Sequence, residues 1–203
     1  MEKISCVLFD LGGVIVYWHN KWLIKEVCIR FELNLKETTK VFQETIPSLS
    51  SGKIQELQFW KEIGKKINSK SLINLDESLY DSIFRKYARI NEPVVQLSHQ
   101  LKHKGYSLGL LSNTEVITYS IVEEMTSMNH FDYKFLSYKI GYTKPDKRIF
   151  HHVLANLPFE KTELLFIDDT LAHVEAALSE GISSIQFSSL DQLIEDMKSL
   201  KIL

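Results

Sequence analysis

The sequence predicts an α/β fold, a doubly wound parallel sheet, with a smaller all-helical block inserted after its first strand. Short apolar segments recur along residues 4–9 and 106–187, nearly without polar interruption. Such segments are typical of strands that a parallel sheet buries on both faces. Helical patterns separate these segments, whereas residues 16–90 show only helical patterns. Alternation of strands and helices favours a doubly wound sheet.

The predicted strands are short, and the strongest of them stop at polar residues. We expect strands at residues 4–9, 106–111, 164–167 and 184–187, with a weaker candidate at 133–136. The first ends at Asp10, the second at Ser112 and the third at Asp168. A polar residue directly after a buried strand marks the edge of the sheet, where the chain returns to solvent.

The helices between these strands have recognisable boundaries. Pro favours the first turn of a helix, Ser and Thr favour the cap before it, and Gly favours the position after it. These signals predict five helices. The first is opened by Pro93 and ends before Gly105, and the second is capped by Thr114 and runs to about Met128. The third runs from Pro145 to Leu157, the fourth starts at Thr170 and ends at Gly181, and the last is capped by a Ser189–Gln192 capping box.

The inserted block divides the chain into two predicted domains. Its helical patterns cover residues 21–32, 36–45, 54–67 and 76–88. We therefore expect an α/β core from residues 1–15 and 91–203 and a helical cap from residues 16–90. Trp18 at the junction is expected to pack a hinge, and Phe59, Trp60 and Phe84 to fill the cap interior.

Composition excludes several classes of protein. The chain has 203 residues, 44% of them hydrophobic, which fits a globular core with a small insert. The formal net charge of −2 gives no basic excess for nucleic acid. The apolar N-terminal stretch is interrupted by Asp10 and two glycines, so we expect a buried strand and loop rather than a membrane span. Two cysteines make a poor disulfide framework, which favours the reducing cytoplasm.

Candidate functional residues stand at three of the predicted strand ends. They are Asp10, the pair Ser112–Asn113 and the pair Asp168–Asp169, and Lys144 precedes a predicted helix. In open α/β sheets, ligands bind outside the carboxyl ends of the strands. If the strands are neighbours, these side chains converge on one crevice.

These residue types suit the chemistry of phosphate esters. A phosphate ester repels a carboxylate nucleophile, so a divalent cation is needed between them. Mg²⁺ prefers oxygen ligands, which Asp10, Asp169 and the Gly12 carbonyl supply. Ser112 and the backbone at Asn113 are expected to donate hydrogen bonds to phosphate oxygens.

Two further features complete this candidate site. Lys144 adds a fixed positive charge for the same phosphate oxygens and for Asp10. Gly12 and Gly13 allow the loop after the first strand to pass close to a bound phosphate. A carboxylate that attacks phosphorus forms an aspartyl-phosphate, which water then hydrolyses.

Taken together, the motifs resemble those of the haloacid-dehalogenase-like superfamily. The similar segments are Phe-Asp-Leu-Gly-Gly-Val at 9–14, Leu-Ser-Asn-Thr at 111–114, Lys-Pro at 144–145 and Phe-Ile-Asp-Asp-Thr at 166–170. Their order matches over nearly the whole chain, and the helical insert stands where that family places its first-type cap. The resemblance implies that Asp10 is the nucleophile, Ser112 binds phosphate and Lys144 stabilises charge. It implies that Asp168 and Asp169 serve Mg²⁺, with Asp169 as the direct ligand.

Gly12 departs from the pattern of the family's phosphatases. Most of them carry a second aspartate at this position, which protonates the leaving group. Such an acid typically contributes about 10²–10⁴-fold in rate. Members that resemble this chain in an Asp-Leu-Gly motif and a small helical cap include sugar-1-phosphate phosphatases. A good leaving group, such as that of a sugar 1-phosphate, needs less protonation.

Two alternatives remain beside that reading. In the first, the protein is a non-catalytic phosphate-ligand binder that keeps the fold without turnover. In the second, it resembles the metal-independent 2-haloacid dehalogenases, which also lack the second aspartate. The pair Asp168–Asp169 disfavours the latter, because buried acids without a counterion are costly. We therefore predict a Mg²⁺-dependent hydrolase of a small phosphate monoester, a monomer or weak homodimer with no nucleic-acid or membrane partner.

Overall fold

Five parallel strands form the central sheet of the computed structural model, which describes residues 3–203. Their order is β5-β4-β1-β6-β7, so β1 is central and β4 and β6 flank it. The strands are β1 (Cys6–Phe9), β4 (Ser107–Ser112), β5 (Tyr133–Leu136), β6 (Leu164–Asp168) and β7 (Ser183–Gln186). All five predicted strands are confirmed, with ends shifted by up to two residues.

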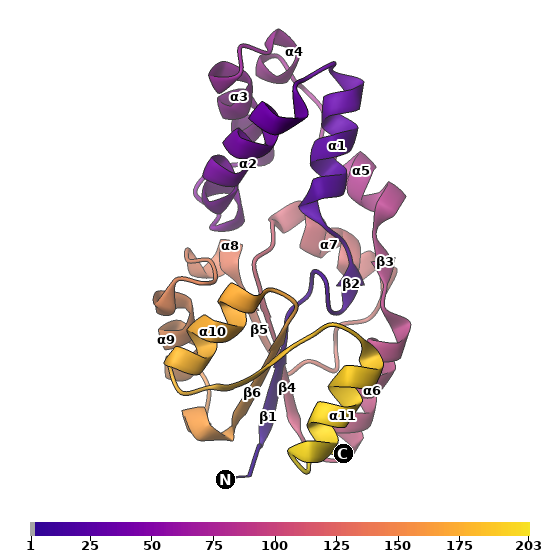
Figure 1. Ribbon diagram of the computed structural model, residues 1–203, viewed down its shortest axis with the longest axis vertical. Coiled ribbons are helices and arrows are strands. Elements are labelled where there is room, and N and C mark those ends of the chain that lie inside the picture. The colour runs from indigo at the N-terminus through magenta and orange to yellow at the C-terminus, as the bar shows by residue number, and fades with distance from the viewer. Residues whose placement is uncertain (1–2) are drawn as a thin grey trace.

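Helices cover both faces of this sheet (Figure 1). One layer contains α9 (Lys147–Ala155) and α10 (Leu171–Ser179), and the other contains α6 (Glu92–His103), α7 (Val116–Met125) and α11 (Leu190–Ser199). Side chains alternate accordingly along β1. Cys6 and Leu8 pack into the cluster with α9 and α10, whereas Val7 and Phe9 pack into the cluster with α6 and α11. The doubly wound α/β prediction is confirmed.

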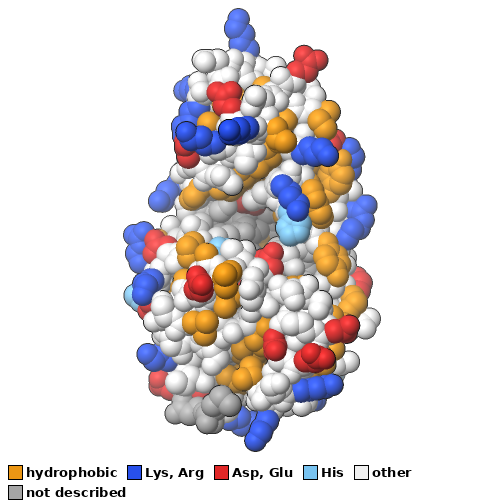
Figure 2. Space-filling model, viewed as in Figure 1, with side chains coloured by type: hydrophobic (Ala, Val, Ile, Leu, Met, Phe, Trp, Pro, Cys, Tyr) orange, Lys and Arg blue, Asp and Glu red, His pale blue; other side chains and the backbone are white. Residues whose placement is uncertain are grey.

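The helices of the insert lie together above the carboxyl ends of the strands (Figure 1). They are α1 (Asn20–Arg30), α2 (Leu35–Ser50), α3 (Glu56–Lys66), α4 (Lys70–Ile73) and α5 (Leu79–Tyr87). Phe59 and Trp60 are fully buried, with ring centroids 4.9 Å apart, as expected of a cap interior. Figure 2 shows a hollow between this helical part and the sheet part.

A two-stranded ribbon connects the helical part to the sheet part. β2 (Val16–Tyr17) pairs antiparallel with β3 (Arg89–Ile90). The buried Asn91 fixes the crossing, because its side chain donates to the Val14 carbonyl at 2.9 Å. We propose that this ribbon is the boundary between the predicted cap, 16–90, and the predicted core, 1–15 and 91–203, of which residues 1 and 2 lie outside the described chain.

Trp18 packs at this junction as expected. It is 9% exposed, and its ring lies 4.7 Å from that of Phe84. Phe84 therefore packs against the hinge residue Trp18, and not only inside the cap.

Several local predictions were wrong. The expectation that residues 16–90 contain no strand missed β2 and β3, because two-residue strands have no periodicity to detect. Glu115, not Thr114, caps α7 through a capping box with Thr118. The helix after Lys144 begins at Lys147, with Asp146 as its cap, rather than at Pro145. The short helices α4 and α8 (Ser137–Ile140) were not predicted.

The C-terminal end of α2 holds the cap against the core. Ser50 Oγ donates to the buried Glu115 carboxylate at 2.6 Å, and Ser137 Oγ donates to the Ser50 carbonyl at 2.5 Å. A Cβ on Gly52 would lie only 2.4 Å from the Tyr138 carbonyl oxygen, so a glycine is required there. These contacts join residues distant in sequence, and they position the cap beside the loop that follows β4.

None of the helices within residues 3–203 has the length and apolar character needed to cross a membrane.

Candidate active site

The three central strands end beside one another and bring the predicted site residues together. Asp10 directly follows β1, while β4 ends at Ser112 and β6 ends at Asp168. Because β4 and β6 flank β1, their connections leave the sheet in opposite directions, and a crevice opens above β1. The tight loop after Asp10 is closed by hydrogen bonds from the Ile15 and Val16 amides to the Leu11 carbonyl at 2.9 and 2.8 Å.

Lys144 is the buried cation of this crevice. Its Nζ lies 2.5 Å from Asp168 Oδ2, 3.0 Å from Asp10 Oδ1 and 2.8 Å from the Leu111 carbonyl oxygen. These three acceptors use all three N–H groups of an ammonium. Burial opposes the charge, but Asp10 and Asp168 outweigh it and raise the pKa of Lys144. The side chain is therefore a fixed positive charge between two carboxylates.

Asp10 presents one free oxygen to the crevice. Its Oδ1 accepts the Leu11 amide at 2.7 Å and contacts Lys144, whereas Oδ2 has no hydrogen-bond donor among residues 3–203. The residue is only 6% exposed. Burial raises the pKa of the Asp10 carboxyl to about 7, even though Lys144 lowers it. A further positive charge close to Oδ2 would favour the ionised, nucleophilic form.

Asp168 is fully engaged by protein donors. Its Oδ1 accepts the Thr170 amide at 2.8 Å, its Oδ2 contacts Lys144, and His173 Nδ1 lies 3.1 Å from both oxygens. Burial opposes ionisation, but Lys144 and His173 hold the pKa of Asp168 well below its ordinary value. Asp168 is therefore a buried carboxylate whose charge is compensated.

Asp169 differs from its neighbour because it has few donors. Among the described residues, only Thr170 Oγ1 donates to its carboxylate, at 3.2 Å to Oδ1, and none donates to Oδ2. Burial and the nearby charge of Asp168 raise its pKa. Its carboxylate lies against Gly13, where an added Cβ would be 2.2 Å from Oδ2. The free oxygen of Asp169 therefore borders the loop that follows Asp10.

Ser112 and Asn113, the two predicted phosphate-binding residues, have different surroundings. Ser112 Oγ is buried and has no hydrogen-bond partner within the described chain. Unsatisfied buried hydroxyls are rare, and one at a strand end is suited to a ligand oxygen. The Asn113 side chain, in contrast, donates to the Lys144 carbonyl at 2.9 Å and accepts the Lys144 amide at 2.8 Å. The amide of Asn113 thus positions the segment that carries Lys144.

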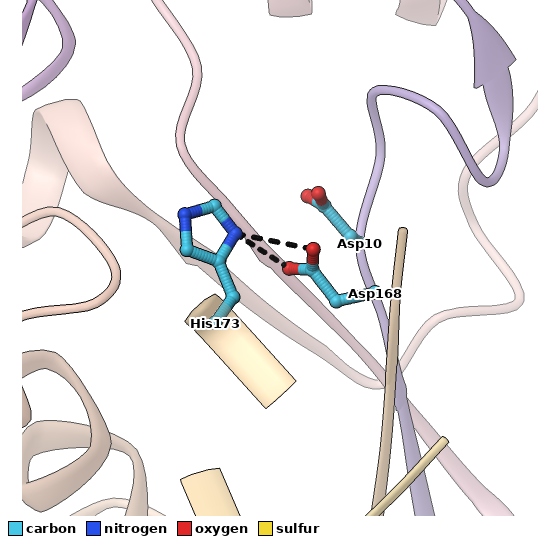
Figure 3. A group of neighbouring side chains, drawn as sticks. All are labelled: Asp10, Asp168 and His173. Carbon is cyan, nitrogen blue, oxygen red and sulfur yellow. Dashed lines mark hydrogen bonds and ion pairs between the residues drawn. The ribbon is translucent and has the colours of Figure 1, made fainter. Parts of the chain in front are cut away.

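Sequence reasoning missed His173, which belongs to the same group of side chains. Figure 3 shows its ring directed toward Asp168, with the Asp10 carboxylate nearby. Ligand atoms of Asp10, Asp168 and His173 all lie within 4.8 Å of one another. His173 is in the first turn of α10, five residues after Asp168. Its position in the turn that follows a strand-end acid was the available signal, because that turn faces the same crevice.

Comparison with known proteins agrees with this geometry. The family model described as haloacid dehalogenase-like hydrolase matches residues 4–181. The chain belongs to this family. The predicted family and hydrolase class are therefore confirmed.

Two curated relatives of this haloacid dehalogenase-like hydrolase are named as phosphatases. The sesquiterpene phosphatase astK of Aspergillus oryzae is 26% identical over 189 residues, covering 91% of this chain and 90% of the relative. The D-ribitol-5-phosphate phosphatase of Bacteroides thetaiotaomicron is 26% identical over 198 residues, covering 90% of this chain and 91% of the relative.

A solved structure shares the fold of the haloacid dehalogenase-like hydrolase. The HAD family enzyme bt-2542 of Bacteroides thetaiotaomicron, crystallised with magnesium and inorganic phosphate, superposes with a TM-score of 0.75 at 23% identity. The superposition covers 94% of this chain and 98% of the bt-2542 chain.

The charges of the crevice fit a divalent cation. Three carboxylates, Asp10, Asp168 and Asp169, face one ammonium, Lys144, so the site is short of positive charge. Among the carboxylate oxygens of the crevice, Asp10 Oδ2 and Asp169 Oδ2 have no donor within residues 3–203. Hard oxygen donors of this kind suit Mg²⁺.

Replacement of Gly13 by alanine is expected to disturb Asp169. Gly13 has φ +82°, which disfavours a side chain by about 1–2 kcal/mol, and the new methyl group would displace the carboxylate. We expect Gly13→Ala to lower the free energy of unfolding by about that amount in urea. Mg²⁺ affinity, measured by calorimetry, should fall as well.

Gly12→Ala is the matched control for this substitution. A Cβ at Gly12 meets no heavy atom within 4 Å, and its φ is not positive. We expect its unfolding free energy to stay within about 0.5 kcal/mol of the wild type. Equal stability and equal Mg²⁺ affinity of the two alanine variants would contradict the placement of Asp169.

Proposed function

We propose that the protein hydrolyses a small phosphate monoester, with Mg²⁺, through an aspartyl-phosphate on Asp10. The observation that carries this proposal is the arrangement around Lys144. A buried ammonium holds one oxygen of Asp10 and leaves the other free, and the neighbouring strand ends at a buried Ser112 hydroxyl that has no partner in the described chain. The names of both curated relatives support phosphate chemistry.

Each residue has a defined task in this reaction. One carboxylate oxygen of Asp10 attacks phosphorus and forms a P–O bond while the bond to the leaving oxygen breaks. Ser112 Oγ donates a hydrogen bond to a phosphoryl oxygen, and the Asn113 backbone N–H is the second predicted donor. The positive charge of Lys144 stabilises negative charge on the same phosphoryl oxygens. Water then cleaves the aspartyl-phosphate and regenerates Asp10.

Oxygens of three residues on two segments would hold the cation. Asp10 and Asp169 supply carboxylate oxygens, and the Gly12 carbonyl is the third predicted ligand. Asp168 is not a direct ligand of the cation in this proposal, because its oxygens are already occupied by Lys144, Thr170 and His173. When bound, Mg²⁺ neutralises charge on the phosphate and on the nucleophile.

The substrate class follows from Gly12 and from the cap. Because position 12 is a glycine, no acid there protonates the leaving oxygen. This favours activated esters such as sugar 1-phosphates. The cap lies above the strand ends and selects compact substrates (Figure 1). As part of the same proposal, the enzyme acts on a cytoplasmic metabolite as a monomer or weak homodimer, with neither nucleic acid nor membrane as a partner.

A panel of phosphate esters tests this proposal. The panel has graded leaving groups and includes aldose 1-phosphates, and it is assayed with Mg²⁺ and with excess EDTA. We expect hydrolysis of the activated esters with Mg²⁺, and loss of that activity in EDTA. Metal-independent release of halide from a 2-haloacid would instead support the dehalogenase alternative. Ester binding without turnover would support the non-catalytic binder.

Introduction of the missing acid is expected to broaden the activity. The open space at Gly12 accepts a side chain, since a Cβ there meets nothing within 4 Å. Gly12→Asp should raise kcat on esters with poor, alkyl leaving groups by about 10²-fold, the lower end for a general acid. Activated esters should gain much less. Gly12→Asn, an isosteric side chain that is no acid, is the control and should show no such selective gain.

A further inference from the structure

His173 is a partly buried imidazole with one defined contact and no assigned role. Its side chain is 16% exposed, and its Nδ1 lies 3.1 Å from each oxygen of Asp168. Figure 3 shows Nδ1 facing Asp168 and the other ring nitrogen facing away from it. No described residue forms a hydrogen bond with that second nitrogen. The contact with Asp168 is therefore what fixes the ring.

The proximity of His173 to Asp10 and Asp168 also fits a metal ligand, because ligand atoms of the three lie within 4.8 Å of one another. The contacts of Asp168 oppose that role. One of its oxygens accepts the Thr170 amide and the other holds the Lys144 ammonium at 2.5 Å. A cation shared by Asp168 and His173 would lie against that ammonium and be repelled by it.

The contacts instead form a chain that ends at Asp10. His173 contacts Asp168, Asp168 holds Lys144, and Lys144 holds Asp10 Oδ1 at 3.0 Å. An imidazole N–H beside both oxygens restricts rotation of the Asp168 carboxylate. Since Asp168 is fully buried, a rotated carboxylate has no solvent to replace the lost contact. Displacement of Asp168 would draw Lys144 away from Asp10.

We propose that His173 is a positioning residue: it fixes the Asp168 carboxylate so that Lys144 stays against the Asp10 nucleophile, and it does not bind the cation. The effect on turnover rests on the proposed phosphohydrolase function. The contact of His173 Nδ1 with Asp168 is independent of that function.

Three variants test this role by steady-state kinetics. We expect His173→Ala to lower kcat by about 10–100-fold, the range for partners that orient active-site ligands, with KM changed less than about threefold. In His173→Asn, the amide nitrogen occupies nearly the position of Nδ1 and donates to Asp168. This variant should recover kcat to within about threefold of the wild type. His151→Ala, which removes an imidazole paired with Glu180 at 2.8 Å on the surface, should match the wild type.

Two kinetic results would overturn the proposal. One is an unchanged kcat in His173→Ala, and the other is a His173→Asn variant as impaired as His173→Ala. Mn²⁺ binding, followed by electron paramagnetic resonance, separates positioning from ligation. We expect equal Mn²⁺ affinity in the wild type and His173→Ala, and no ¹⁴N coupling from a histidine ligand. A tenfold loss of affinity, or such a coupling, would make His173 a ligand.

A nuclear magnetic resonance experiment tests the contact without turnover. In protein labelled with ¹⁵N-histidine, we expect a slowly exchanging Nδ1–H signal of His173 that shifts or disappears in Asp168→Asn. Its absence in the wild type would refute the inference even if the enzyme is active. Its presence in a protein that hydrolyses no ester would refute the proposed function and leave the His173–Asp168 contact standing.

Discussion

Asp10→Asn is expected to abolish hydrolysis of phosphate esters. The amide keeps the shape of the side chain and still accepts the Leu11 amide and Lys144, but it is no nucleophile. Loss of a covalent nucleophile costs a factor of at least about 10⁴ in kcat. The assay is release of inorganic phosphate from the best ester of the panel, with Mg²⁺ at saturation.

The fold of this variant should persist. The wild-type carboxyl is buried, and burial raises its pKa to about 7, so a neutral side chain is readily accommodated. We expect the free energy of unfolding to change by less than about 1 kcal/mol. Asp76→Asn, an exposed substitution in the cap, is the control for activity. More than a tenth of wild-type turnover in Asp10→Asn would refute the assignment of the nucleophile.

Lys144→Met is expected to cause the largest loss of stability. Methionine matches the length of the side chain but leaves Asp10 and Asp168 buried without their cation. Breaking a buried ion pair by removing one partner typically costs about 3–5 kcal/mol. That is a large fraction of the roughly 5–15 kcal/mol by which a domain is stable. Urea unfolding at neutral pH, with EDTA present so that no metal replaces the ammonium, measures the loss.

A double variant distinguishes uncompensated charge from poor packing. Lys144→Met combined with Asp168→Asn removes one of the two buried charges together with the cation. We expect it to recover at least half of the stability lost in Lys144→Met. If the double variant is as unstable as the single one, the loss comes from packing around Phe166, whose ring centroid lies 5.1 Å from Lys144 Nζ.

Much of the fold was predictable because its signals are local. Each strand is an apolar segment, and each strand that carries a site residue stops at a polar one. Asp10, Ser112 and Asp168 were therefore placed at strand ends correctly. The cap of α11 was also predicted, since Ser189 Oγ accepts the Gln192 amide. Thr114 was misassigned as a cap, because its hydroxyl instead contacts Thr118 and Glu115 takes the cap position.

The contacts that decide the site were not predictable in the same way. Asn113 was expected to donate to phosphate through its backbone, and the pairing of its side-chain amide with the backbone of Lys144 was not predicted. The position of His173 in the turn after Asp168 indicates that it lies near the crevice, but not that its ring contacts Asp168. The Ser50–Glu115 contact joins the cap and the core across 65 residues. Such pairings depend on how the elements pack, which a short stretch of sequence does not contain.

By itself, the sequence determined the α/β class, the helical insert, the family and the identity of the strand-end acids. Tertiary structure alone decided which acid is free and which is compensated. Asp168 is held by Lys144 and His173, while Asp169 turns an oxygen toward the loop after Asp10. The two aspartates are adjacent and chemically identical, so only the charges and donors that folding brings around each of them give them different roles.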